Sequence, residues 1–313
     1  MGKKLVDILK TARPRQWVKN LTLFAALIFT GYLFSAAVFW KDFGIVTQAV
    51  MAFTAVAVAI YFLNDVIDVE ADKMHPFKRK RPIAAGRISR GEALVISGLA
   101  AIVGLTWTFK LSLLFGTIVL AYLVMQILYS MWLKNVEVVD VFVIALGFFL
   151  RVFAGAIVIN AHLSIWFLLC VISVSLFLAV GKRRAEMAIL TEQGAVQHRK
   201  VMGKYSADIL DAYLAMFATA AWMSWALFTF NFYEQAAPEL ASPVGLGIIS
   251  RTLTINKWLM VSIPVVIFGI MRYLRVVYDG SRAETPERVI LSDTPLLATV
   301  AVWGLIVITV LYL

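Results

Sequence analysis

Long apolar stretches, separated by short polar segments, dominate the pattern along the whole chain. The apolar runs are about 17 to 23 residues long, enough for a helix to cross the hydrocarbon core of a bilayer with some tilt. They predict nine membrane-spanning helices, at about residues 21–39, 45–63, 93–109, 111–131, 137–158, 163–181, 207–231, 257–276 and 295–313. The third and fourth are separated only by the short gap around Lys110.

The composition agrees with this pattern. The 313 residues are 61% hydrophobic and only 15% charged, with a mean hydropathy of +0.85. A soluble domain of this length is far less apolar, so we predict an all-α integral membrane protein that forms one polytopic domain over residues 1–313. The only cysteine, Cys170, lies within a predicted span, which excludes a disulfide and a thiolate metal site.

Most of the positive charge, which sums to a net +10, lies in three polar segments. These are residues 1–20, 64–92 and 182–206, and nine spans with a cytoplasmic N-terminus place all of them on the cytoplasmic side. The polar segment 277–294 follows on the same side. We therefore expect a multi-pass protein of the cell membrane, with an amphipathic leader at 1–20, three cap segments and a cytoplasm-facing active site. Nucleic-acid binding is disfavoured, because no soluble domain presents these charges.

Three aspartates at the end of the second predicted span are the strongest chemical signal. Asp65, Asp68 and Asp72 are spaced i, i+3 and i+7, which places them on one face of a helix. Carboxylates crowded in this way repel one another unless a cation lies between them, and oxygen ligands suit Mg²⁺. A charged helix end that pairs with Lys73 or Arg79 is the structural alternative.

A basic run follows the aspartates directly. Lys78, Arg79 and Arg81 are placed to bind phosphate oxygens, and Asn64 is placed to orient a phosphate or a ligating carboxylate. An acidic group followed by a basic group at the mouth of a membrane protein predicts a Mg²⁺–diphosphate site.

Further polar residues are candidates for contact with a substrate. Arg151 lies inside the fifth predicted span, where a charge is costly and usually marks a substrate path or a buried pair. The remaining candidates lie at the ends of spans, where membrane anchoring and local i, i+4 pairing are the alternatives: Lys19, Asn20, Tyr129, Lys134, Lys182, Arg183 and Glu186.

These residues resemble the UbiA superfamily of intramembrane prenyltransferases over nearly the whole chain. The resemblance is carried by Arg13-Pro14 with Trp17, the motif from Asn64 to Asp72, Arg81-Pro82 with Gly86, and Tyr129 with Lys134. It implies helices around a central cavity, and a first acidic motif that binds Mg²⁺ and a diphosphate, with the three aspartates as the catalytic residues.

One departure from the family pattern bears on the substrate. Members that prenylate aromatic rings carry a second acidic motif after the sixth span, whereas residues 181–186 read Gly-Lys-Arg-Arg-Ala-Glu. The chain resembles instead the branch that transfers 5-phosphoribose from phosphoribosyl diphosphate to a polyprenyl (decaprenyl) phosphate, in the synthesis of a cell-wall arabinan precursor. His75-Pro76 belongs to this likeness.

Two alternatives stay open. One is a prenyl-diphosphate-dependent transferase that acts on an aromatic or other acceptor, and the other is a transporter, because charge within a membrane and two related halves also suit alternating access. Against the transporter, the polar residues gather on one face. A homo-oligomer is compatible with the sequence.

Overall fold

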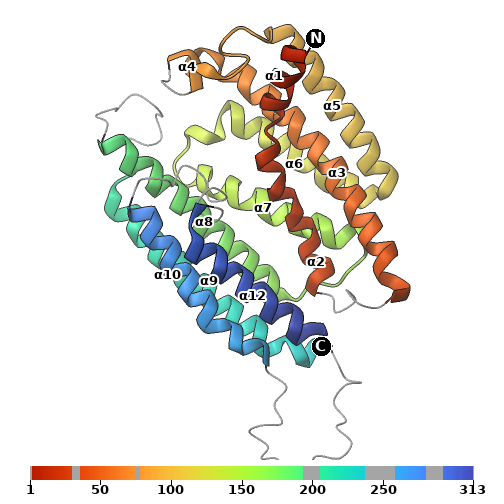
Figure 1. The fold of residues 1–313 in the computed structure, drawn as a ribbon, viewed down its shortest axis with the longest axis vertical. Coiled ribbons are helices and arrows are strands. Elements are labelled where there is room, and N and C mark those ends of the chain that lie inside the picture. Colours follow the sequence, from red (N-terminus) through yellow and green to blue (C-terminus); the bar gives the residue numbers. More distant parts are fainter. Residues whose placement is uncertain are drawn as a thin grey trace, which may run out of the picture. The chain divides into compact units, whose positions relative to one another are not determined.

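The computed structural model describes residues 2–29, 36–74, 78–192, 205–236, 258–279 and 292–312 (Figure 1). The elements within these ranges are helices, with no strand among the residues described. Eight of the helices are long and apolar enough to cross a membrane. The predicted all-helical membrane class is therefore confirmed.

The chain divides into two compact units. The first contains residues 1–27, 35–161 and 195–205, and the second contains residues 28–34, 162–194 and 206–313. Each unit holds four of the eight candidate spans. The single polytopic domain that we predicted stays a prediction.

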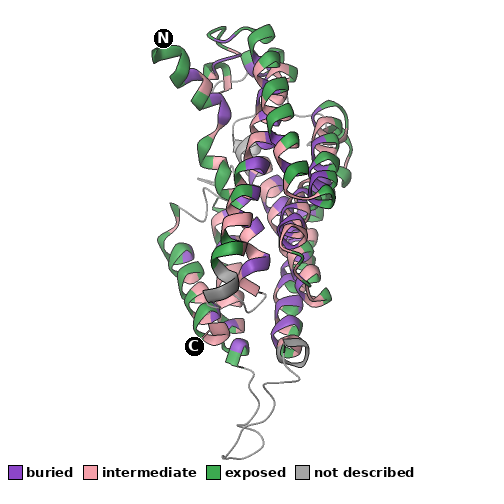
Figure 2. Cartoon of the chain, turned by 90° about the vertical axis from the view of Figure 1, so that its right-hand side faces the viewer, coloured by how far each residue is buried: buried purple, intermediate pink, exposed green. Residues whose placement is uncertain are grey.

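The first unit is built from α3 (Ala36–Ile67), α5 (Arg90–Leu111), α6 (Leu113–Met131) and α7 (Val139–Val158). Short elements join them: α4 (Val69–Met74), η2 (Lys78–Lys80) and η3 (Leu133–Asn135). Phe53 of α3, Phe115 of α6 and Ala154 of α7 are fully buried in its core. Most helices have both buried and exposed residues (Figure 2), as expected where one side packs on neighbouring helices and the other meets lipid.

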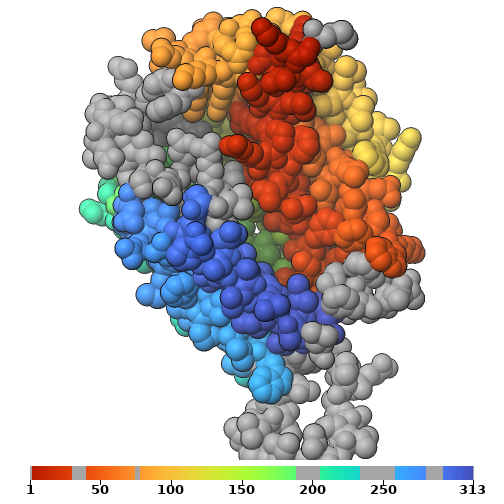
Figure 3. All heavy atoms as spheres, viewed as in Figure 1, coloured from red at the N-terminus to blue at the C-terminus, as the bar shows by residue number. Residues whose placement is uncertain are grey.

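The N-terminal part of this unit consists of α1 (Gly2–Ala12) and the 3₁₀ helix η1 (Pro14–Leu23). α1 contacts α3 and lies at the surface beside the orange and yellow helices of the unit (Figure 3). η1 packs closely on α7, since a Cβ added to Gly155 would lie 2.1 Å from the carbonyl oxygen of Leu23. Glycine at this position thus permits the approach of the two backbones.

The second unit contains α8 (Ile165–Glu192), α9 (Ala207–Ala236), α10 (Ser262–Tyr278) and α12 (Thr294–Tyr312), with the short η5 (Trp258–Val261) before α10. α8 and α9 pack on each other, and α10 packs on both α8 and α12. Trp225 on α9 donates a hydrogen bond through Nε1 to Ser262 Oγ at 2.9 Å, so its polar edge is satisfied inside this apolar bundle.

Eight of the nine predicted spans correspond to these helices. Even the short gap after Lys110 is real, because α5 ends at Leu111 and α6 begins at Leu113. The first predicted span, 21–39, is not among the eight. It contains the end of η1, the six-residue helix α2 (Phe24–Phe29), the start of α3 and residues outside the described ranges. The span at 21–39, and with it the count of nine, stays a prediction, as does the cytoplasmic N-terminus.

Candidate active site

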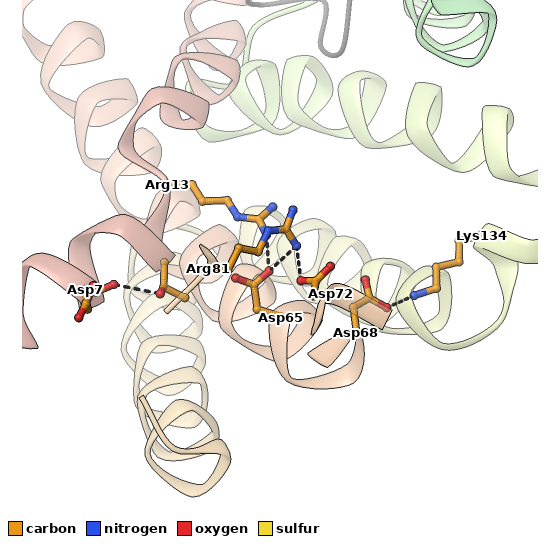
Figure 4. A network of polar contacts seen from close by, with 8 residues as sticks. Asp7, Arg13, Asp65, Asp68, Asp72, Arg81 and Lys134 are labelled. Atoms are coloured by element: carbon orange, nitrogen blue, oxygen red, sulfur yellow. Dashed lines mark hydrogen bonds and ion pairs between the residues drawn. The ribbon is translucent and has the colours of Figure 1, made fainter. Parts of the chain in front are cut away.

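The three predicted aspartates lie where α3 gives way to α4. α3 ends at Ile67, Asp68 lies in the turn and Asp72 belongs to α4, so the aspartates do not share one regular helix as predicted. The helical hydrogen-bond pattern nevertheless continues across the break, from Asp68 N to Asn64 O (2.9 Å) and from Asp72 N to Asp68 O (2.8 Å). The carboxylates therefore still come out on neighbouring turns (Figure 4).

Two arginines hold the first and last of these carboxylates. Arg81 Nη1 lies 2.7 Å from Asp72 Oδ2 and 3.2 Å from Asp65 Oδ1, so one nitrogen bridges both groups. Arg13 Nη2 donates to the same Asp65 oxygen. Figure 4 shows both guanidinium groups beside Asp65 and Asp72. The alternative of pairing with Lys73 or Arg79 is therefore wrong for these two aspartates.

Asp68 has a different partner. Its Oδ1 accepts a hydrogen bond from Lys134 Nζ at 2.5 Å, and Lys134 comes from η3, between α6 and α7. Both side chains are partly exposed. Lys134 thus contacts one of the aspartates in this structure, and the phosphate contact expected from the sequence stays a prediction.

The acids and the arginines differ in exposure. The side chains of Asp65 and Asp72 are 2% and 5% exposed, whereas those of Arg13 and Arg81 are 19% and 29% exposed. The carboxylates thus lie beneath an outer layer of guanidinium groups. Burying a carboxylate is costly unless it is paired with a cation, and Arg13 and Arg81 provide this pairing.

The backbone that carries Arg81 is firmly anchored. Ile83 and Ile88, just beyond it, are buried in a small core with Phe62 and Val69. The turn between these isoleucines needs a left-handed residue, which Gly86 supplies at φ +72°. The position of the Arg81 backbone is therefore set by apolar packing, independently of its contacts with the acids.

Arg13 reaches Asp65 through an unusual backbone. Its backbone is left-handed (φ 53°, ψ 60°), although it directly precedes Pro14 and a residue before proline prefers an extended backbone. Trp17 Nε1 fixes the turn by donating to Ala12 O at 2.9 Å, and the guanidinium lies 5.3 Å from the ring centroid of Tyr61. A residue held in a rare conformation against a charged site points to function.

The acidic group fits a divalent metal in its chemistry and not in its present arrangement. Carboxylate oxygens are the ligands that Mg²⁺ prefers. Among the residues described, however, no three His, Cys, Asp or Glu side chains are arranged to hold a metal ion. The place between Asp65 and Asp72 is taken by Arg81 Nη1. A metal would need that guanidinium to move away before it could bind both carboxylates.

Arg151 forms a second polar cluster of this unit, and its partners are neutral. Nε donates to Asn20 Oδ1 (3.0 Å), Nη1 to Gly147 O (2.7 Å) and Nη2 to Tyr122 Oη (2.5 Å). Aromatic rings surround the guanidinium, with the centroid of Tyr122 at 4.8 Å and that of Phe53 at 5.4 Å. Among the residues that the structure describes, no acidic side chain from another helix contacts Arg151. Its contact with a substrate phosphate stays a prediction.

Another strained residue lies between Lys134 and α7. Val138 has φ 67°, a value that β-branched residues rarely adopt. Its N–H donates to Tyr205 Oη at 2.7 Å, and Tyr205 donates at 2.7 Å to Asp140, which is completely buried. The sequence analysis missed this contact because Tyr205 lies 67 positions from Val138, and no local pattern connects the two.

The basic end of α8, in the second unit, is paired with acids. Arg183, which is completely buried, lies 2.5 Å from Glu186, and Lys182 lies 4.0 Å from the same carboxylate. The local pairing considered as an alternative is thus present. Arg184 and Tyr278 both bond to Asp211, at 2.6 and 2.8 Å, a cluster that the sequence analysis missed.

The other predicted binding residues have varied environments. Arg79 is exposed on η2, and Lys78, Lys19, Asn64 and Tyr129 are half-buried. Glu70, left out of the predicted site, points to solvent, and hydrogen bonds from Lys73 and Arg90 lower its pKa. Of the predicted cap segments, residues 193–204 and 280–291 lie outside the described ranges, as does His75-Pro76.

The fold and the site are those of an all-helical membrane protein with an acidic group beneath a basic layer. Comparisons with known proteins identify its family. The model of the UbiA prenyltransferase family matches residues 22–288. The chain belongs to this family, and it is a multi-pass membrane protein.

Two of the relatives that are similar over nearly their whole length are phosphoribosyltransferases. The decaprenyl-phosphate phosphoribosyltransferase of Mycolicibacterium smegmatis is 33% identical, with 96% of this chain and 91% of the relative covered. That of Corynebacterium glutamicum is also 33% identical, with 99% and 89% covered.

A solved structure shares the fold. The UbiA homologue from Archaeoglobus fulgidus bound to GPP and Mg²⁺ has a TM-score of 0.67 at 17% identity, with 97% of this chain and 99% of that chain covered. Divalent metals therefore occur in solved members of this fold.

Proposed function

We propose that the protein transfers 5-phosphoribose from phosphoribosyl diphosphate to a polyprenyl phosphate, decaprenyl phosphate in the relatives, and releases diphosphate. The observation that carries the proposal is the likeness to two phosphoribosyltransferases over nearly the whole chain. The aspartates, arginines and lysine of the candidate site are also the residue types that a metal–diphosphate complex requires. The product would supply cell-wall arabinan synthesis. The active site would lie on the cytoplasmic side of the cell membrane, where phosphoribosyl diphosphate is available.

The proposed metal site is formed by Asp65, Asp68 and Asp72. Bound there, Mg²⁺ would neutralise charge on the diphosphate and make it a better leaving group. Arg81, Lys78 and Arg79 would bind the diphosphate oxygens as negative charge grows on them when the bond to the ribose breaks. Oxocarbenium character then develops at the anomeric carbon, as in glycosyl transfer generally.

The lipid phosphate would attack that carbon directly. A phosphate monoester is already anionic near neutral pH, so no strong general base is needed. Lys19, Lys134 and Lys182 are candidates for steering the lipid phosphate. A single displacement inverts the anomeric centre, and a product of retained configuration would contradict this mechanism.

A second candidate function is supported by the bound ligand of the solved relative. The A. fulgidus homologue holds GPP, a prenyl diphosphate, and a site for one diphosphate can accept another. In this version the prenyl group would be transferred, to an aromatic or other acceptor. Lys182, Arg183 and Arg184, where prenylating members carry an acidic motif, argue against it.

The choice of donor is tested with purified protein in detergent and Mg²⁺. One reaction contains labelled phosphoribosyl diphosphate with polyprenyl phosphate, and the other contains a labelled prenyl diphosphate with aromatic acceptors. We expect label to enter the lipid phase only in the first. Transfer only in the second, by the same folded preparation, would replace the phosphoribosyl proposal with the prenyl one.

A further inference from the structure

We infer that Arg13 and Arg81 act as exchangeable counter-ions, which hold the aspartates until substrate arrives and then pass to the diphosphate. The inference rests on the proposed function and adds an order of events to it. In the resting protein the guanidinium groups bind Asp65 and Asp72. When a metal–diphosphate complex enters, the carboxylates bind the metal and the guanidinium groups bind phosphate oxygens.

The charges of the cluster support such an exchange. Three carboxylates, Asp65, Asp68 and Asp72, are matched by three cations, Arg13, Arg81 and Lys134. A divalent metal alone would add charge that nothing in this part-buried cluster balances. A metal that arrives with an anionic diphosphate brings its own compensation. The metal alone should therefore bind weakly, and the metal with diphosphate strongly.

The form of the arginine contacts also supports it. Neither arginine uses the two-pronged geometry that makes arginine–carboxylate pairs strong. Arg13 bonds through Nη2 alone, and Arg81 bonds through Nη1 alone. Among the residues described, no protein atom accepts a hydrogen bond from Arg81 Nε or Nη2. These donors are available to receive an anion before the carboxylates are released.

The exchange requires side-chain movement only. Both guanidinium groups form the outer layer over the buried acids, so they can move away without repacking the core. The backbone of Arg81 is fixed by the burial of Ile83 and Ile88, and the turn at Arg13 is fixed by Trp17. Each arginine therefore remains within reach of the site after it releases its carboxylate.

The inference is tested by metal binding, which needs no turnover. Mn²⁺ is titrated into the full-length protein in detergent, and free Mn²⁺ is followed by electron paramagnetic resonance, with and without inorganic diphosphate. For the wild type we expect weak binding of Mn²⁺ alone and a strong gain with diphosphate. For Arg81→Gln we expect Mn²⁺ alone to bind about tenfold more tightly, because the competing charge is gone, and the gain with diphosphate to shrink.

Controls make the result specific. Arg90→Gln, from the same connection, removes a cation that pairs with the exposed Glu70 and should behave as the wild type. Arg13→Gln should shift binding in the same direction as Arg81→Gln, and serves if the latter does not fold. Unchanged or weaker binding of Mn²⁺ alone in the folded arginine variants would overturn the exchange and leave the metal site intact. No binding of Mn²⁺ by any variant, with or without diphosphate, would overturn the metal site and the exchange together.

Discussion

Arg81 and Arg151 lie in the same unit, and the difference between their surroundings leads us to expect different roles for them. The side chain of Arg81 is 29% exposed, and its polar contacts with described residues are with carboxylates, through one nitrogen. Arg151 is 6% exposed and satisfies all three of its nitrogens with neutral groups of η1, α6 and its own helix. An arginine that is paired with carboxylates can exchange them for the phosphate groups of a ligand. An arginine whose hydrogen bonds all go to neutral groups has no such exchange to make.

The comparison also separates two ways to keep a charge in an apolar protein. Around Arg81 the cost of burial falls on the aspartates and is offset by cations from three separate segments of the chain. Around Arg151 it falls on the arginine itself and is offset by hydrogen bonds and aromatic faces. Removal of charge should therefore abolish activity at the first cluster and lower stability at the second.

The largest effect is expected at the aspartates. Asp68→Asn removes a carboxylate that is 27% exposed and paired with Lys134, so the fold should survive. Transfer should fall on the order of 10²-fold or more, because charge stabilisation at the diphosphate is lost. Initial rates of label transfer measure this. Glu70→Gln is the matched control, since Glu70 is exposed beside the site, and an equal loss there would mean that Asp68 has no special role.

Replacement of Arg151 should produce the opposite outcome. Arg151→Met keeps much of the volume but leaves Asn20 and Tyr122 without their shared donor. We expect a loss of about 3 kcal/mol in stability, since buried oxygens that accept from a charged donor lose their hydrogen bonds. Mn²⁺ affinity should not change in protein that remains folded. A variant of normal thermal stability with lost lipid binding would show instead that Arg151 contacts substrate.

A smaller effect is expected at one of the neutral partners. Tyr122→Phe removes only the hydroxyl that accepts from Arg151 Nη2, and the ring that faces the guanidinium remains. The loss should be about 1 kcal/mol, the scale of a single hydrogen bond inside a membrane protein. Thermal unfolding in one detergent compares it with Arg151→Met. Equal losses in the two variants would mean that the hydroxyl, and not the whole network, holds Arg151.

The smallest effect is expected at a third arginine, in the second unit, which shows how an ordinary pair behaves. Arg272 binds Asp293 through two nitrogens, at 2.9 and 2.7 Å, and this holds the pKa of Asp293 below its usual range. The stability from the pair is present above the pKa of the unfolded carboxyl, and it is lost as the pH falls through the lower pKa of the folded protein.

Thermal midpoints between about pH 5 and about pH 3 measure this contribution. Asp293→Asn can still accept the hydrogen bond that Leu296 N donates to Asp293, so it should cost less than about 1 kcal/mol near neutral pH. Part of the decline of the wild type in acid should be absent in this variant. Parallel pH profiles for the two proteins would show that the pair contributes nothing.

Much of the fold followed from the sequence because a bilayer constrains it strongly. A run of apolar residues long enough to span must be helical, so hydropathy placed α5, α6 and α7 within three residues of their observed starts. The span expected at residues 21–39 stays a prediction, because apolar character does not determine backbone continuity. There the chain changes from the 3₁₀ helix η1 to the six-residue α2.

The site was predictable where it is local. The i, i+3, i+7 spacing found the three aspartates, since their backbone hydrogen bonds remain helical. The role of Arg13 was missed because its contact with Asp65, 52 residues away, depends on a left-handed backbone before Pro14. The neutral partners of Arg151 were missed for the same reason, since Asn20 and Tyr122 reach it only through tertiary packing.

The most direct test of the central claim uses phosphoribosyl diphosphate with one label in the ribose and another in the β-phosphorus. The wild-type protein, with Mg²⁺ and polyprenyl phosphate, should move the ribose label into the lipid phase. It should release the phosphorus label into water as diphosphate in equal amount, and Asp68→Asn should do neither. Ribose label that stays in water with the wild type, or transfer that persists in Asp68→Asn, would contradict the account.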